Sequence, residues 1–460
     1  MIRATTGGVL KSYRANLMGS FVSMNKARDT VLSQRTFNSY AEDPAAAAKA
    51  FRLRKSRMTV DSQHSICSDA LKKYETGFSC LQSIDEVLDT KNGEPSSAMK
   101  TLKGTTLTML NDPSGDAREQ LTKVLDQMSE MLIQNMNQKY GDNFIFAGAD
   151  GHNVPFEIKN GELFYRGVSV DAAVPNVITN GKDADGNPIP MKVNTTVQPP
   201  LADTNGGSYV KMDASAFISQ EEFDNIIKND PTATQPKILY QNATDPQFFD
   251  GEGNVVDPAT YTGKLYYLNM DKAETMTIKE YDDQVLEAEK LEYLKGETNY
   301  VDIGLGFQEN EKGNLIGSSA FDAALNGVNF LGSGLDEDGD PKNIYSLVQK
   351  LKGIGAKIHD GEQWTDADYD EFNRLVGKLE LASSDFKTEF TNMAASTTKL
   401  QNNEKLLEEN FYNLQEQYAA IEDVDMVDSI TSFIWAQYCY NAALKVGNSV
   451  LSESLMDYLN

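Results

Sequence analysis

The side chains that most often perform chemistry are few in this sequence and lie far apart. The histidines and cysteines are His64, His152, His359, Cys67, Cys80 and Cys439. A zinc site needs several convergent ligands, and none of these residues belongs to a metal-ligand pattern such as HExxH. The sequence also lacks the GxSxG, GxxxxGK[ST] and GxGxxG-helix patterns of hydrolases and nucleotide-binding proteins. We therefore predict no enzyme activity, no catalytic residue, no cofactor and no metal site.

Two acidic turns and one basic cluster are the remaining candidates for binding. DADGNP (183–188) and DEDGDP (336–341) carry alternating carboxylates beside glycine, but neither has the EF-hand spacing. Turns between strands explain them better, and weak binding of divalent cations stays open. The cluster FRLRKSR (51–57) is basic enough to suggest nucleic acid. It lies on an expected helix, however, and an acidic C-terminal segment is available to face it.

The charges divide the chain into three parts. Residues 1–60 hold eleven basic and three acidic residues, whereas residues 401–460 hold two basic and ten acidic residues. Opposite charges favour pairing of the two ends, although each exposed ion pair contributes only about 0–1 kcal/mol. The net charge of −26 therefore belongs to the middle of the chain. Such a middle argues against nucleic acid and anionic membranes, and no apolar run is long enough to predict a transmembrane helix.

The two ends of the chain carry the pattern of helices that need a partner. Apolar residues three, four or seven positions apart mark one face of a helix over 9–32 and of another over 421–460. In the second stripe, Gln437 and the Gly447–Asn448 pair interrupt the pattern. Each stripe needs another helix to bury it, and each end is a candidate partner for the other. The residues expected to make assembly or partner contacts are Leu10, Tyr13, Leu17, Phe21, Met24, Ile430, Phe433, Tyr440, Leu444, Leu451, Leu455 and Tyr458.

The sequence between the ends changes from helical to turn-rich and back to helical. Helices are expected over 45–91, 96–110, 116–136, 343–361 and 366–424. Asp43–Pro44 is a good start for the first of these, and a heptad-like repeat from Val60 to Leu88 places Cys67 and Cys80 on its apolar stripe, where buried free thiols are expected. Residues 155–171 form two alternating runs around Asn160-Gly161, which is a strong hairpin signal. From there to about 340, short strand-like runs such as 264–270 and 300–307 alternate with turns, with helical segments near 218–228 and 278–295.

We predict an α+β fold from this order. It would be an elongated rod of long, paired, coiled-coil-like N- and C-terminal helices with an inserted, mainly β outer domain. The expected domains are 1–40 with 425–460 as terminal assembly helices, 41–150 with 343–424 as a helical rod, and 151–342 as the β insertion.

Several strings resemble the bacterial flagellin superfamily. NSYAEDPAAAAKAFRL (38–53) is similar to its connector followed by an alanine-rich helix, and IEDVDMVDSI (421–430) with AALKVGNSVLSESLMDYL (442–459) is similar to its C-terminal signature. NFIFAGADGHNVPF (143–156) resembles the step into the β domain of one branch, the hook–filament junction proteins (hook-associated protein 3). VDIGLGF (301–307) and SSAFDAALNGVNFLGSG (318–334) resemble the end of that domain.

This resemblance implies a structural role in the flagellum. The expected partners are the upstream hook-associated protein, flagellin, neighbouring copies in a ring and a flagellar export chaperone. The expected location is the extracellular flagellum, reached by the flagellar type III system, since residues 1–17 lack the apolar core of a secretory signal. Two alternatives remain: a flagellin that builds the filament itself, and an adhesin or enzyme domain carried on a flagellin-like rod.

Overall fold

The computed structural model describes residues 6–88, 101–111, 115–193, 207–229, 236–241, 245–357 and 364–459, with 6, 7, 9, 115–117 and 449–459 described by their backbone alone. The chain divides into two compact units. Unit 1 comprises Met1–Lys72, Tyr300–Asp322 and Ser396–Asn460, and unit 2 comprises Lys73–Asn299 and Ala323–Ala395. Helices α2 (Pro44–Leu88) and α9 (Asp366–Glu422) contribute residues to both units. A search of the described helices finds none with an apolar stretch that could cross a bilayer.

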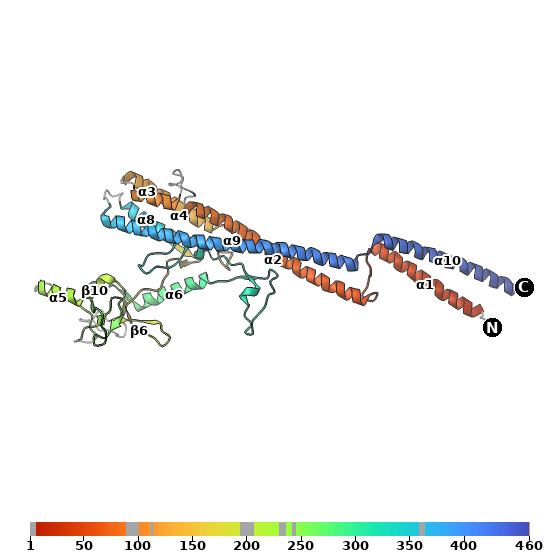
Figure 1. Cartoon of the computed structure of the whole chain (residues 1–460), viewed down its shortest axis with the longest axis horizontal. Helices are drawn as coiled ribbons and strands as arrows, with labels where there is room; N and C mark the ends of the chain where they lie inside the picture. The colour runs from red at the N-terminus through yellow and green to blue at the C-terminus, as the bar shows by residue number, and fades with distance from the viewer. Residues whose placement is uncertain are drawn as a thin grey trace. The chain divides into compact units, whose positions relative to one another are not determined.

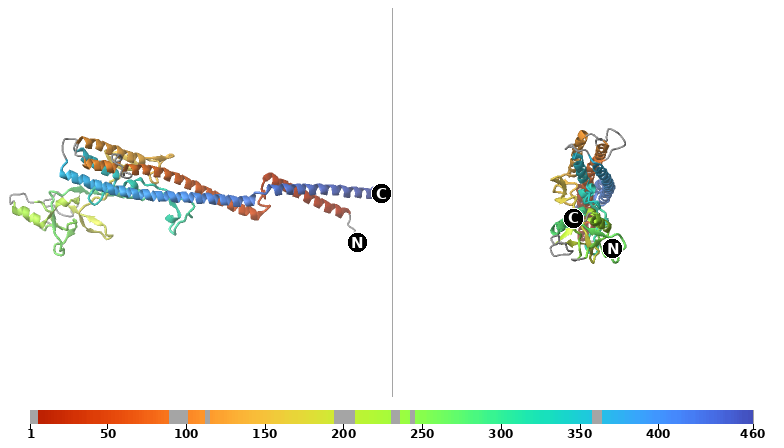
Figure 2. Two further views of the ribbon diagram at one scale, coloured as in Figure 1. Left: turned by 45° about the horizontal axis from the view of Figure 1, so that its top comes forward. Right: turned by 90° about the vertical axis from the view of Figure 1, so that its left-hand side faces the viewer.

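In unit 1, the first and last helices of the chain form an antiparallel pair. They are α1 (Thr6–Ser33) and α10 (Met426–Leu459), which lie side by side in both views (Figures 1 and 2). The ring of Phe21 lies 5.6 Å from that of Tyr440, and Gly447 lies against Tyr13. As residue numbers rise on α1, those of their partners on α10 fall. The two ends of the chain therefore pair with each other, as their patterns and charges predict.

The connectors that follow α1 and precede α10 are also paired. The N–H of Thr36 donates to the carbonyl of Glu422 at 2.8 Å, and Arg35 and Asp423 form an isolated antiparallel bridge. Just beyond, Asp43 caps α2: its carboxylate accepts the N–H of Ala46 at 2.9 Å. This confirms the predicted start of α2 at an Asp-Pro pair, where proline has no N–H to leave unpaired.

The remainder of unit 1 packs the first half of α2 against the second half of α9. The Sγ of Cys67 lies 3.7 Å from the carbonyl of Leu400, and both residues are buried. Strands β15 (Tyr300–Val301) and β16 (Phe321–Asp322) pair antiparallel, with the short helix η3 (Gly317–Ser319) just before β16. The strand expected over 300–307 ends at Val301. The chain turns there because Gly304 and Gly306 both adopt positive φ.

Unit 2 contains a helical core. Helices α3 (Leu102–Asn111), α4 (Gly115–Met136) and α8 (Ile344–Ala356) join the second half of α2 and the first half of α9. Large buried side chains fill the space between them: Leu81, Ile84, Leu102, Met109, Leu125, Leu132, Phe372 and Phe386. Phe78 of α2 stacks on Phe390 of α9 with centroids 4.8 Å apart. The heptad spacing of α2 is thus used along its length, as predicted.

The middle of unit 2 holds small antiparallel sheets. In one sheet β1 (Lys139–Tyr140) pairs with β2 (Asn143–Phe144), and in another β6 (Thr179–Lys182) pairs with β7 (Pro188–Pro190). A three-stranded sheet has the order β3 (Phe156–Lys159), β4 (Glu162–Tyr165), β5 (Val168–Ser169). A three-stranded sheet has the order β14 (Thr275–Thr277), β9 (Ser208–Val210), β8 (Lys192–Val193). A four-stranded sheet has the order β10 (Phe217–Ser219), β13 (Tyr266–Leu268), β11 (Phe248–Phe249), β12 (Val255–Val256).

Short helices connect these sheets. They are η2 (Ala214–Ala216), α5 (Gln220–Asn229), α6 (Ile278–Lys295) and α7 (Gly327–Leu331). Helix α6 begins with a capping box, in which the Thr277 hydroxyl and the Glu280 carboxylate each accept the other residue's N–H. Both helical segments expected here, α5 and α6, are present. The long helices together with antiparallel sheets confirm the α+β prediction.

The β3–β4 hairpin turns at the predicted dipeptide. Asn160 and Gly161 have φ of 55° and 87°, as a type I′ turn requires at both central positions. Four residue pairs, from Phe156–Tyr165 to Lys159–Glu162, keep the register. The side chains of Phe156 and Tyr165 are both buried, and their ring centroids lie 5.0 Å apart.

The two segments that enclose most of the β region are joined to each other. The N–H of Gly148 donates to the carbonyl of Leu325 at 3.0 Å, and the N–H of Gly327 donates to the carbonyl of Phe146 at 2.9 Å. A Cβ on Gly327 would lie 2.9 Å from the Phe146 carbonyl, so only glycine permits this approach. Residues 143–156 and 318–334, which carry the resemblance to a β-domain start and end, thus meet through their backbones.

Candidate assembly surface

The inner face of the α1–α10 pair has a strict seven-residue repeat. On α10 its positions alternate in steps of three and four, and all are buried or half-buried: Met426, Ser429, Phe433, Ala436, Tyr440, Ala443 and Gly447. The facing positions on α1 are half-buried: Tyr13, Leu17, Ser20, Met24, Ala27 and Val31. This is the spacing of an antiparallel coiled-coil contact.

The predicted contact residues divide between two faces of this pair. Five of them are half-buried on the inner face or beside it: Tyr13, Leu17, Met24, Phe433 and Tyr440. Four are exposed by 41–43%: Leu10, Phe21, Ile430 and Leu444. The side chains of Leu451, Leu455 and Tyr458 lie outside the described residues. The predicted stripe therefore mixes residues that pack within the chain with residues that face outward.

Small residues on the inner face were missed by sequence reasoning. Ser429, Ala436 and Ala443 stand seven residues apart, and this spacing is the signal that could have found them. Gly447 was treated as an interruption of the stripe, but it is buried. A Cβ there would collide with the hydroxyl of Tyr13. Small side chains let the two helices approach closely, so the face they form is invisible to a search for large apolar residues.

A second set of large apolar residues covers the outside of the pair. On α10 they are exposed by 42–74%: Val427, Ile430, Ile434, Trp435, Tyr438, Leu444 and Val446. On α1 they are Leu10, Met18, Phe21, Val22 and Leu32. We call these residues the outer terminal face. Apolar exposure on this scale is typical of a surface that binds another protein.

Opposite charges meet where the connectors pair. The carboxylate of Glu422, with its side chain only 5% exposed, lies 3.1 Å from the guanidinium of Arg35 and 3.3 Å from that of Arg54. Arg54 also donates to the hydroxyl of Tyr418 at 2.6 Å, and the guanidinium of Arg57 lies 5.4 Å from the centre of the same ring. Part of the basic cluster at 51–57 therefore faces acidic and aromatic side chains of its own chain.

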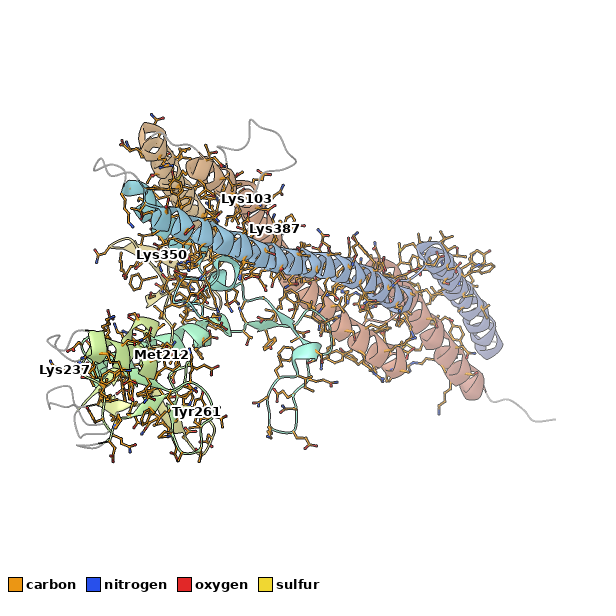
Figure 3. The ribbon with its side chains drawn as sticks, turned by 60° about the vertical axis from the view of Figure 1, so that its left-hand side comes forward. Lys103, Met212, Lys237, Tyr261, Lys350 and Lys387 are labelled. Atoms are coloured by element: carbon orange, nitrogen blue, oxygen red, sulfur yellow. The ribbon has the colours of Figure 1, made fainter. Side chains whose placement is uncertain are left out.

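The acidic turn at 336–340 contains its own counter-ion. Oxygens of Asp336, Asp338 and Asp340 lie within 4.8 Å of one another, close enough to hold a metal ion. The ammonium of Lys378 lies 2.6, 2.8 and 2.6 Å from these three carboxylates. Lys350 of α8, labelled in Figure 3, adds a contact to Asp340 at 3.0 Å, and Arg374 of α9 adds another. The turn binds lysine and arginine where a calcium loop would bind a cation.

The pKa values of this cluster follow from these contacts. Burial alone would raise the pKa of Asp340, but hydrogen bonds from Arg374, Lys378 and Lys350 outweigh it and hold that pKa well below its usual range. Burial alone would lower the pKa of Lys378, but the three carboxylates raise it well above its usual range. Asp340 and Lys378 are therefore both charged over the whole physiological range of pH.

The second acidic turn and the histidines show simpler environments. Asp183 accepts the N–H groups of Asp185 and Asn187 at 2.9 and 2.8 Å and closes the β6–β7 turn, as expected for a turn residue. His64 is half-buried on α2 and His152 is exposed, while His359 lies outside the described residues. Within the described part of the chain, no hydrogen bond or ion pair joins His64 or His152 to a cysteine or to each other.

The cysteines differ sharply in exposure. Cys67 and Cys80 are buried on α2, as predicted, and burial raises the pKa of both thiols. Cys439 is exposed on α10. Buried thiols of raised pKa behave as small apolar side chains rather than nucleophiles.

Comparison with known proteins finds distant structural likeness only. No family model matches the sequence, and no curated protein matches it. Among solved structures, a flagellar hook-associated protein from Vibrio parahaemolyticus has 10% identity and a TM-score of 0.41, with 83% of this chain and 100% of the other covered. FlgL from Xanthomonas campestris has 14% identity and a TM-score of 0.35, with 80% and 99% covered.

A further solved structure has a similar name. The flagellar junction protein FlgL from Legionella pneumophila has 11% identity and a TM-score of 0.33, with 76% of this chain and 99% of the other covered. These proteins carry the names of the branch that the sequence strings resemble. Their identities and scores are too low to decide fold or function, so both rest on the residues and contacts of this chain.

Proposed function

We propose that this chain is a structural junction protein of the bacterial flagellum, which connects the hook to the flagellin filament. The observation that carries the proposal is the α1–α10 pair. Its inner face packs within the chain, while its outer terminal face exposes large apolar side chains such as Trp435 and Tyr438, which are 65% and 71% exposed. A chain whose two ends pair and present one apolar surface is suited to assembly through those ends.

The joined segments at 143–156 and 318–334 support a junction protein over a flagellin. Both strings resemble the branch of junction proteins, and the backbone bonds between Gly148 and Leu325 and between Gly327 and Phe146 hold them together. The β region then leaves and rejoins the helical part at one place. A flagellin remains the alternative, and the assembly experiment that closes the Discussion separates the two.

The proposed role includes its partners and place. The chain binds the upstream hook-associated protein on one side and flagellin on the other, stands beside neighbouring copies in a ring, and is escorted by an export chaperone. It works outside the cell, after export through the flagellar type III system. Residues 1–40 with 425–460 form the inner assembly layer, 41–150 with 343–424 form the helical layer, and 151–342 face outward.

The role is non-catalytic in this proposal. A cleft of about 860 Å³ in unit 2 has carboxylates in its wall, among them Glu162, Glu287 and Glu337. The described residues that line it include neither histidine nor cysteine, so they offer no nucleophile paired with an imidazole base. This cleft is where an adhesin or enzyme function of the middle domain would be sought.

Binding to hook ends tests the proposal. Purified chain is mixed with isolated hooks that carry the upstream hook-associated protein, pelleted, and located by immunogold electron microscopy. We expect label at one end of each hook. Leu444→Asp, on the outer terminal face, should abolish the label without changing the melting temperature, because Leu444 is already 42% exposed. Asn448→Asp adds the same charge at an exposed polar position of α10 and should bind normally. Absence of label with the unmodified chain contradicts the proposal.

A further inference from the structure

A groove runs along the exposed side of α2 in unit 1. Its volume is about 490 Å³, and residues three or four positions apart on α2 line it: Phe51, Lys55, Met58, Ser62 and Ile66. Phe51 and Met58 are 56% and 65% exposed. The opposite wall includes Asp302, which is held in place by a 3.0 Å hydrogen bond from Gln63. We call this site the α2 groove.

The surroundings of the α2 groove are basic. Residues 44–60 carry five basic residues and no acidic one. Arg54 and Lys55 both line the groove, and Arg54 also contacts Glu422. An occupant of this groove should therefore present apolar side chains together with carboxylates.

The outward side of α9 in the same unit has those properties. Leu406 and Tyr412 are 54% and 61% exposed, and Glu409 and Glu416 are exposed on the same side of the helix. Residues 404–416 hold four glutamates and one lysine. We call Leu406, Glu409, Tyr412 and Glu416 the outer α9 face.

A chain cannot place its own outer α9 face in its own groove. Leu400 and Leu407 are buried on the side of α9 that faces α2, where Leu400 meets Cys67. Glu409 is two residues beyond Leu407, and two residues span about 200° around a helix. The outer α9 face thus points away from the α2 of its own chain, and a second copy is needed to bring the two surfaces together.

We propose that the α2 groove binds the outer α9 face of a second copy of this chain. The two surfaces differ, so a bound pair still offers one free groove on one copy and one free outer α9 face on the other. Such a head-to-tail contact generates a ring or a helical row rather than a closed pair. The inference rests on the proposed function in that copies stand side by side, and it names the surfaces by which they do so.

Disulfide trapping between copies tests this contact. All variants carry Cys439→Ser, because Cys439 is the exposed native thiol. Chains with Met58→Cys are mixed with chains with Leu406→Cys, in solution and after addition to hook ends, and then oxidised. We expect a cross-linked pair of chains in the mixture. Gln415→Cys is the matched control, since Gln415 is exposed and lies nine residues from Leu406, about 180° around α9, and should cross-link to Met58→Cys roughly tenfold less.

A charge exchange tests the electrostatic part. Lys55→Glu places a carboxylate in the groove and should lower the yield of the Met58–Leu406 cross-link by roughly tenfold, because like charges then face each other. Adding Glu409→Lys and Glu416→Lys to the partner chain should restore most of the yield. Failure of this restoration, or equal yields from Leu406→Cys and Gln415→Cys, overturns the inference.

The outcomes separate this contact from the proposed function. Binding to hook ends without the Met58–Leu406 cross-link would support the junction role and contradict the α2–α9 contact. Cross-linking in solution without binding to hook ends would support the α2–α9 contact and contradict the junction role.

Discussion

Removal of the Lys378 charge is the sharpest test of how unit 2 is held together. Lys378 contacts three carboxylates at 2.6–2.8 Å, and its own side chain is only 15% exposed. Lys378→Met keeps most of the length and apolar stem of the side chain. It leaves Asp336, Asp338 and Asp340 close together with their charges no longer balanced by the ammonium.

The cost of this change follows from the burial of each partner. Breaking a buried ion pair costs about 3–5 kcal/mol because a charge is left uncompensated. Asp340 is 7% exposed, but Arg374 and Lys350 still contact it, and Asp338 is 67% exposed and can be solvated. We therefore expect a loss of about 2–3 kcal/mol in the free energy of unfolding. For a unit of this size, that lowers the melting temperature by roughly 3–5 °C.

Asp340 and Lys378 make the stability of unit 2 depend on pH, the first at acidic pH and the second at alkaline pH. Asp340 has a depressed pKa, so its contribution is present above the ordinary aspartate value of about 3.9 and is lost as pH falls through the folded pKa. Lys378 has a raised pKa, so its contribution is present below the ordinary lysine value of about 10.4 and is lost as pH rises through the folded pKa. Lys378→Met should remove the alkaline part of this loss.

Scanning calorimetry with and without calcium measures the effect. In Lys378→Met no ammonium contacts all three carboxylates, so millimolar calcium should bind there and recover part of the lost stability, while the unmodified chain should respond little. Lys103→Met is the control, and Lys103 is labelled in Figure 3. The Lys103–Glu380 pair is 42% and 48% exposed, and exposed pairs contribute only about 0–1 kcal/mol. Equal melting temperatures for Lys378→Met and Lys103→Met would refute this account of the turn.

Three further predictions concern α1, α2 and α10. Gly447→Val improves helix propensity by less than about 1 kcal/mol, but its side chain collides with Tyr13 of α1. Hydrogen exchange of the α1 amides should therefore become faster. Slower exchange would show that the helices do not pack at this glycine. Glu422→Gln removes the charge that holds Arg35 and Arg54, so trypsin should cleave the connector 34–43 roughly tenfold faster. Unchanged cleavage would mean that backbone hydrogen bonds alone keep the connector ordered. A thiol reagent should label Cys439 quickly and Cys67 and Cys80 only on unfolding; rapid labelling of all three would contradict the packing of α2.

Local signals in the sequence predicted most of the helices and the best-defined turn. The Asp43–Pro44 pair starts α2, the repeat over α2 places Cys67 and Leu71 in the core, and Asn160-Gly161 closes the β3–β4 hairpin. Each of these signals depends on residues within a few positions of one another. For that reason they can be interpreted without knowing the rest of the fold.

Contacts between distant segments could not be predicted in the same way. Lys378 is about forty residues from the turn that it neutralises, and neither segment contains a pattern that identifies the other as its partner. The strand order β10-β13-β11-β12 depends on which apolar faces meet after collapse. The inner face of α10 could not be found from hydrophobicity for a different reason: Ala443 and Gly447 form it through their small size, whereas Leu444 is larger but faces outward. Hydrophobicity alone favours the larger residue.

The role as a junction is tested most directly by seeded assembly. Isolated hooks that carry the upstream hook-associated protein receive this chain, are washed, and then receive flagellin, with electron microscopy after each step. We predict a short layer that stops growing by itself and without which flagellin does not extend the hook. Long filaments from this chain alone would make it a flagellin. Extension by flagellin in its absence, with no layer at the hook end, would contradict the junction role.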